Sequence, residues 1–279
     1  MFGDDKTIKI IFFGDMVGRP GRFAVRDYLS KQPQNEKVSQ FIIANVENAS
    51  HGFGLTEKNY NEISEYGIDC MTAGNHIWDK KEIFNYIDRA DKLVRPINYP
   101  NGTVGKGSRI FELSNGIKIG VINVLGRVFM APVDSQWTVV KEEIERIKAI
   151  TPIVIVDFHA EATAEKICFA RFCSELGVSA FFGTHTHVQT ADEQIINGMG
   201  YITDAGFCGT KESVIGMEYT TSLHRFTTVI PERYDVADGN VVQINAVEVE
   251  IDSTSGHTVA IRRIFCYVDK EKKEEENEK

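Results

Sequence analysis

The chain has 279 residues, of which 42% are hydrophobic and 25% are charged, a mix typical of a globular protein. Its 31 Lys and Arg residues face 40 Asp and Glu residues, a formal charge of -9. This balance argues against a general binder of polymeric nucleic acid, since such proteins carry a basic face. A small phosphorylated ligand remains compatible with it, because a few local cations or metal ions override the global sign.

The sequence also indicates where the protein resides. Its longest apolar runs, such as Ile8–Phe13 and Ile153–Val156, are far shorter than the ~20 residues that cross a bilayer. The N-terminal segment is too acidic and too poor in apolar residues for a signal peptide. Five cysteines without a C-x-x-C spacing indicate a reducing compartment instead of a disulfide framework. We therefore expect a cytoplasmic protein with no membrane segment.

The first third of the chain alternates short apolar runs with amphipathic segments. Strands are expected at Ile8–Phe13, Phe41–Val46 and Asp69–Ala73, and helices near Phe23–Lys31, from Thr56, and from Asp79 to Ile87. Asp79 and Glu82, three residues apart, resemble a capping box at the start of the last helix. The strands are apolar on both faces, which is typical of an α/β sheet covered on both sides.

The rest of the chain adds antiparallel strands. Arg109–Leu113 and Ile117–Val124 flank a Ser-Asn-Gly turn and predict a β-hairpin. Further helices are expected near Val139–Ile150 and Thr163–Leu176, and further strands at Ile153–Asp157, Ser179–Phe182, Val188–Ile196, Tyr201–Thr203, Val241–Ile251 and Thr258–Val268. This order favours two mixed β-sheets packed together with helices outside. We expect one domain over residues 1–268 and a charged, disordered tail over residues 269–279.

Metal-binding side chains follow five of the predicted strands. The segments that contain them are Gly14-Asp15, Glu47-Asn48, Gly74-Asn75-His76, Phe158-His159 and Gly183-Thr184-His185-Thr186-His187. Loops at the carboxyl ends of strands converge on the binding crevice of α/β proteins, so these side chains are expected to meet. In extended backbone, residues two apart project to the same face, which would let His185 and His187 reach one centre.

Each of these positions also has an ordinary structural explanation, such as a turn aspartate, a loop cap or a buried histidine. Their joint occurrence favours a metal site. Two carboxylates, amide oxygens and three or four imidazoles exceed the needs of one ion, so two ions are predicted. Mixed nitrogen and oxygen ligands suit iron, manganese or zinc. Two such ions ~3.5–4 Å apart clamp the attacking and leaving oxygens of a displacement at phosphorus.

These positions lie in longer motifs, and through them the chain resembles the YmdB-like branch of the calcineurin-type metallophosphoesterases up to about Val268. The motifs that carry the resemblance are GDMVGRPGR, ENASHGFGLT, AGNHIWD, FHAEATAEK, GTHTHVQTAD and DAGFCGTKESVIGM. The resemblance implies a four-layer αββα sandwich of two mixed β-sheets, a di-metal centre usually containing iron, and phosphodiesterase activity towards cyclic nucleotides. It leaves a homo-oligomer open.

The resemblance also implies a role for each motif residue. Asp15 and His187 hold the first metal with Asn48 close by; Asn75, His159 and His185 hold the second; and Glu47 bridges the two. His76 lies beyond the ligands and protonates the leaving alkoxide. In the wider superfamily a histidine ligand commonly follows two residues after the first aspartate, but Met16-Val17-Gly18 follows Asp15 here. The first metal is therefore expected to have fewer protein ligands.

We hypothesise that a hydroxide bridging the two metals attacks the phosphorus of a small phosphodiester, such as a cyclic nucleotide. A phosphomonoesterase or nucleotidase with the same site is one alternative, and a nucleotide-binding regulatory protein without turnover is another. Substrate-binding residues are not identified, and His51 and Lys211 are weak candidates. Phe53, Phe129 and Phe207 are candidates to stack on a nucleobase, although packing explains each of them better.

Overall fold

The computed structural model describes residues 7–32 and 39–270 of the chain. The tail expected over residues 269–279 lies outside these residues except for its first two positions. Within the described ranges, no helix combines the length and the apolar character needed to cross a membrane.

The strands form two mixed sheets, as predicted. The first has seven strands in the order β2-β11-β12-β1-β3-β4, with β13 paired to β12. Their bounds are β1 Thr7–Phe13, β2 Asp15–Met16, β3 Ser39–Asn45, β4 Cys70–Thr72, β11 Phe207–Thr210, β12 Val241–Asp252 and β13 Thr258–Asp269. The second has six strands in the order β5-β6-β7-β8-β10-β9. Their bounds are β5 Ser108–Glu112, β6 Lys118–Leu125, β7 Val154–His159, β8 Ala180–Thr184, β9 Gln194–Ile196 and β10 Met199–Ile202.

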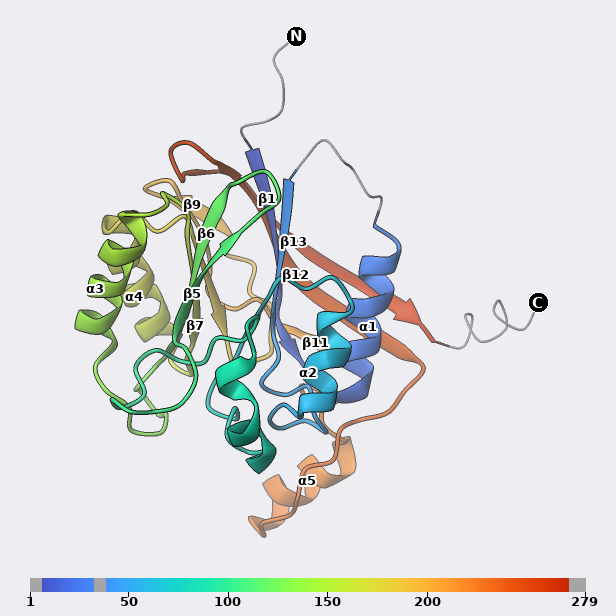
Figure 1. Cartoon of the computed structure of the whole chain (residues 1–279). Helices are drawn as coiled ribbons and strands as arrows, with labels where there is room; N and C mark the ends of the chain where they lie inside the picture. The colour runs from blue at the N-terminus through green and yellow to red at the C-terminus, as the bar shows by residue number, and fades with distance from the viewer. Residues whose placement is uncertain (1–6, 33–38, 271–279) are drawn as a thin grey trace.

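The two sheets pack face to face between two layers of helices (Figure 1). Apolar side chains from β1 and β12 meet those from β7 and β8 in the central core, where the Phe12 and Phe182 rings stack at 4.5 Å. Helices α1 (Gly18–Ser30) and α2 (Glu57–Ser64) cover the outer face of the first sheet. Helices α3 (Gln136–Lys148) and α4 (Thr163–Glu175) cover the second. The α/β, four-layer αββα prediction is confirmed.

Parallel pairing brings the functional strand ends to one edge. In the first sheet, β1, β3 and β4 run parallel, with Phe13 opposite Ala44 and Asn45 opposite Thr72. In the second sheet, β6, β7 and β8 run parallel, with His159 opposite Thr184. All the loops that follow these strands therefore emerge at the same edge of the sandwich, where α/β proteins bind ligands.

Two predicted helices differ from the structure. Helix α1 begins at Gly18, five residues before Phe23, because Pro20 fits the first turn of a helix. The α-helix expected over Asp79–Ile87 is wrong, since this segment forms two short 3-10 helices, Lys81–Asn85 and Ile87–Arg89.

The residues of the predicted capping box have other partners. The Asp79 carboxylate lies 2.8 Å from His76 Nδ1. Glu82 Oε1 instead accepts from the backbone N–H of Glu57, at the start of α2, at 2.7 Å. Tertiary contacts have thus overridden a local helix signal at both positions.

The strand expected over Val188–Ile196 is also mostly wrong, because only Gln194–Ile196 pairs in the second sheet. Upstream of it, the Gln189 side-chain amide donates to backbone carbonyls of other segments of the protein, including that of Ala246 on β12 at 3.0 Å. Helix α5 (Tyr219–Thr228), which the apolar pattern did not indicate, projects from the same end of the molecule as the functional loops (Figure 1).

Candidate metal centre

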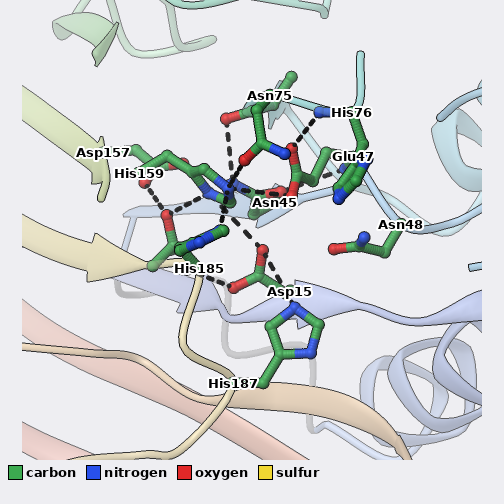
Figure 2. A network of polar contacts seen from close by, with 12 residues as sticks. Asp15, Asn45, Glu47, Asn48, Asn75, His76, Asp157, His159, His185 and His187 are labelled. Carbon is green, nitrogen blue, oxygen red and sulfur yellow. Dashed lines mark hydrogen bonds and ion pairs between the residues drawn. The ribbon is translucent and has the colours of Figure 1, made fainter. Parts of the chain in front are cut away.

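Four of the predicted ligands converge on a single point, the Nε2 atom of His159. It lies 2.9 Å from Glu47 Oε1, 3.1 Å from Asn75 Oδ1 and 3.0 Å from His185 Nδ1. Figure 2 shows the four side chains pointing toward one another, His159 from the end of strand β7 and the other three from loops. Ligand atoms of Glu47, His159 and His185 all lie within 4.8 Å of one another, close enough to share one metal ion. We refer to Glu47, Asn75, His159 and His185 together as the inner cage.

The other predicted ligands lie next to the inner cage. Asp15 Oδ1 is 3.8 Å from His187 Nε2 and 3.8 Å from His159 Nδ1, while Asp15 Oδ2 accepts from the His185 backbone N–H at 3.1 Å. Asp15 Oδ1 and Asn48 Oδ1 are both buried, and neither accepts a hydrogen bond from any residue in the described ranges. Such oxygens are costly to bury unless a cation or another donor binds them. A cation bound beside His187 would satisfy both oxygens.

Hydrogen bonds fix which nitrogen of His159 faces the cage. Its Nδ1 lies 3.0 Å from Thr184 Oγ1, and that hydroxyl donates its own hydrogen to Asp157 Oδ1 at 2.7 Å. Thr184 must therefore accept from Nδ1–H, which leaves Nε2 of His159 as the nitrogen that could bind a metal ion. Such outer hydrogen bonds orient metal-binding histidines in many proteins.

The other two imidazoles are oriented in the same way. His187 Nδ1 lies 2.9 Å from the Ile215 carbonyl, which can only accept, so Nε2 faces Asp15. His185 Nε2 lies 3.1 Å from Glu161 Oε2, which leaves Nδ1 directed at the inner cage. In each of the three histidines, one ring nitrogen is therefore held towards the centre.

His185 and His187 lie in a strained turn and not in an extended strand. Strand β8 ends at Thr184, and the two histidines have φ angles of 98° and 63°. The prediction that alternation along a strand places them on one face is wrong. Non-glycine residues at positive φ cost about 1–3 kcal/mol each and persist where the surroundings hold them.

Here the surroundings are a buried ion pair beneath the turn. Asp204 Oδ2 accepts from the backbone N–H of Thr186 at 3.1 Å and from its hydroxyl at 2.7 Å. Lys166 Nζ, from α4, lies 2.7 Å from the same oxygen, and both charged side chains are buried. The pair therefore holds the residue between the two histidines.

Burial and neighbouring charge set the protonation of the inner cage. Burial by itself raises the pKa of Glu47, but the adjacent His159 and the His76 N–H lower it to about 2. Burial by itself lowers the pKa of His159, but Glu47 and other nearby carboxylates raise it to about 9. Burial and the charge of His159 lower the pKa of His185 to about 3. Near pH 7 Glu47 is thus ionised and His185 neutral, the forms that bind metal ions, whereas His159 is protonated and would release its Nε2 proton on binding a metal ion.

Close packing makes one glycine necessary at the inner cage. A β-carbon on Gly74 would lie 2.3 Å from Glu47 Oε2 and 2.4 Å from His159 Nε2. No side chain fits there unless the two ligands move apart. Glycine before Asn75 therefore allows the chain to pass directly beneath the site.

Two predicted substrate-binding candidates lie outside the pocket beside the cage. His51 is exposed in the loop after β3, and Lys211 Nζ sits 4.9 Å above the ring of Tyr267 on β13. Sequence reasoning missed the supporting residues Asp157, Thr184, Lys166 and Asp204. Asp157 could have been noticed as a polar residue inside an apolar strand, IVIVDFH. The roles of the other three depend on contacts between distant segments.

The hydrogen bond from Thr184 to His159 supplies a first prediction. Thr184→Val keeps the shape of the side chain but removes the acceptor that orients His159. We expect the affinity for Mn²⁺, measured by calorimetric titration of the metal-free protein, to fall by about 10–100-fold. Thr184→Ser retains the hydroxyl and is expected to bind Mn²⁺ as the unsubstituted protein does. Equal affinities of the valine and serine variants would contradict the orienting role.

Two mixed sheets between helices, with metal-binding side chains at the carboxyl ends of parallel strands, define a metallophosphoesterase-type fold. Residues 11–264 match the model of the family described as YmdB-like protein, and the chain belongs to this family. The membership agrees with the resemblance carried by the motifs.

Three relatives illustrate the similarity. A 2′,3′-cyclic-nucleotide 2′-phosphodiesterase of Bacillus subtilis (strain 168) is 44% identical over 259 residues, which cover 92% of this chain and 97% of the relative. The crystal structure of a novel phosphatase from Mycoplasma pneumoniae superposes with a TM-score of 0.86 at 34% identity, covering 96% of both chains. A hypothetical protein from Thermus thermophilus gives a TM-score of 0.83 at 35% identity, covering 93% of this chain and 99% of that one.

Proposed function

We propose that this protein is a binuclear metal-dependent phosphodiesterase that hydrolyses small phosphodiesters of the cyclic-nucleotide class. A metal-dependent phosphoric diester hydrolase is also the class to which its relatives point. The observation that carries the proposal is the convergence of Glu47, Asn75 and His185 on His159 Nε2, beside the unpartnered oxygens of Asp15 and Asn48. Packing alone gives no reason for this arrangement.

The residues divide between two ions. Asn75, His159 and His185 would hold one, Asp15, Asn48 and His187 would hold the other, and Glu47 would bridge the two. Iron is the first choice of metal, with manganese or zinc as alternatives for this ligand set. When bound, such a pair supplies hydroxide near neutral pH and neutralises charge on the phosphoryl oxygens.

His76 is the residue to which we assign donation of a proton to the leaving oxygen. It lines the pocket beside the inner cage, and its backbone N–H donates to Glu47 Oε2 at 2.9 Å. Its Nδ1 lies 2.8 Å from Asp79 Oδ2, so this carboxylate holds one ring hydrogen and orients the other nitrogen. As an imidazolium with Nδ1–H on Asp79, His76 would donate Nε2–H to the departing alkoxide as the phosphorus–oxygen bond of the diester breaks. The hydroxide of one water molecule adds to phosphorus and completes the phosphomonoester, and the proton that this water loses restores the imidazolium.

The test uses protein stripped of metal with a chelator and reloaded with Mn²⁺ or Fe²⁺. We expect metal-dependent hydrolysis of a 2′,3′-cyclic nucleotide and of bis(4-nitrophenyl) phosphate, both faster than hydrolysis of 4-nitrophenyl phosphate. The His159→Ala variant is expected to be inactive after the same reloading. Faster turnover of the monoester would identify a phosphomonoesterase instead. Tight nucleotide binding without any product would identify a regulatory protein.

A second prediction tests His76 through the leaving group. The His76→Asn variant is expected to hydrolyse a 2′,3′-cyclic nucleotide about 100-fold more slowly, because its alkoxide needs a proton. Hydrolysis of bis(4-nitrophenyl) phosphate is expected to fall by less than about tenfold, because nitrophenolate leaves without one. Single-turnover rates with both substrates check this. An equal loss on the two substrates would show that His76 does not act as an acid.

A further inference from the structure

The pocket at the metal centre has two chemically different walls. Its volume is about 180 Å³. One wall consists of residues of the metal centre and its proposed acid: Glu47, Asn48, His76, His185 and His187. The rest of the lining, which we call the apolar wall, consists of Phe53, Val214, Ile215, Met217, Phe226 and Tyr234, together with Ser222. A phosphate group needs only the first wall, so the second one requires a different explanation.

The apolar wall is fixed relative to the metal centre. Apart from Phe53, it comes from residues 214–234, the segment that contains α5 (Figure 1). Met217 packs in a small core with Val17 and Phe207, and Tyr234 packs against that core. The Ile215 carbonyl accepts from Nδ1 of His187. A ligand held at the metals would therefore meet the apolar wall in a defined position.

The aromatic rings of the apolar wall differ in which faces are available. The Phe53 and His76 rings meet edge to face with centroids 4.9 Å apart, and the Arg225 guanidinium covers one face of Tyr234 at 4.3 Å. Phe226, on α5, is 71% exposed although it lines the pocket. An exposed phenylalanine contributes nothing to the core, whereas a flat ring stacked on it would bury both surfaces.

We propose that the apolar wall binds the nucleobase of the substrate by stacking, with Phe226 as its main contact, and that it accepts different bases. The inference rests on the proposed function, because the phosphodiester must be held at the metals. Discrimination between bases requires hydrogen bonds to their edges. The polar side chains of this wall are those of Ser222 and Tyr234, and the Ser222 hydroxyl already donates to the Glu218 carbonyl. Stacking on an aromatic ring, by contrast, tolerates every base.

The experiment compares substrates with and without a base. The substrates are the 2′,3′-cyclic phosphates of adenosine, of uridine and of methyl riboside, which has no base. We expect Phe226→Ala to raise KM for both nucleotides about tenfold and to change kcat less than twofold. The methyl riboside substrate is expected to be unaffected, and Phe226→Tyr to restore the nucleotide KM. The matched control is Phe265→Ala, because Phe265 is also an exposed ring, on β13, where it contacts Tyr267.

The outcomes separate this inference from the proposed function. If Phe226→Ala leaves KM for the nucleotides unchanged, or alters all three substrates equally, the stacking role is wrong while the diesterase activity stands. If the protein prefers one of the two nucleotides by more than about a hundredfold, the inference that the apolar wall accepts different bases is wrong. If the unsubstituted protein hydrolyses no diester at all, the proposed function fails. Calorimetric binding of adenosine 3′-monophosphate to the unsubstituted and Phe226→Ala proteins then decides whether the wall binds a base.

Discussion

Replacing Glu47 by glutamine is expected to lower hydrolysis of a cyclic nucleotide by more than about 10³-fold while the protein remains folded. Glu47 is completely buried, and His159 and the His76 N–H hold its pKa at about 2, so it carries a full negative charge. Glutamine has nearly the same shape but no charge, which removes the carboxylate that lies beside His159. A loss of about 4 kcal/mol of charge stabilisation corresponds to this factor.

Two measurements check this expectation. Elemental analysis of the purified variant is expected to show fewer metal ions per chain, and kcat is measured at saturating Mn²⁺. Glu161→Gln is the matched control, because Glu161 lies 3.1 Å from the outer nitrogen of His185 but is half exposed. Solvent screens that contact, so we expect a loss of less than about tenfold. A Glu47→Gln variant with unchanged metal content and activity would refute the assignment of Glu47 to the cage.

The fold was predictable because its strands are apolar and short. Ile8–Phe13 is observed as Thr7–Phe13, and the hairpin over residues 109–124 is observed as β5 and β6. The expected helix at Asp79–Ile87 failed because the side chains of its capping signal bind elsewhere, to His76 and to the start of α2. A local capping pattern does not predict a helix where its polar side chains form hydrogen bonds with residues outside that helix instead.

The site was predictable to the level of residue type and strand end. Asp15, Glu47 and His159 each lie at or just after the end of an apolar strand, and parallel pairing brings such positions together. The geometry of His185 and His187 was not predictable, because positive φ angles at histidine depend on what surrounds the turn. Sequence spacing carries no information about a contact such as that between Lys166 and Asp204, which are 38 residues apart.

That buried ion pair gives the second large effect. Lys166→Met is expected to lower the free energy of unfolding by about 3–5 kcal/mol. Methionine fills the space of the lysine stem, but it leaves the Asp204 carboxylate buried without its cation. Lys166 is 1% exposed and Asp204 is fully buried, so solvent does not compensate. The melting temperature is expected to fall by roughly 10 °C, as measured by calorimetry at fixed protein and metal concentrations.

The double variant Lys166→Met/Asp204→Asn separates loss of charge pairing from loss of packing. If an unpaired charge causes the destabilisation, the double variant recovers much of it, since an amide is far less costly to bury than a carboxylate. Arg89→Met, which breaks an exposed pair with Glu57, is expected to cost less than about 1 kcal/mol. Equal destabilisation of the single and double variants would mean that the lysine stabilises the fold through its hydrocarbon stem. The turn at His185 and His187 would then be held by its own hydrogen bonds to Asp204.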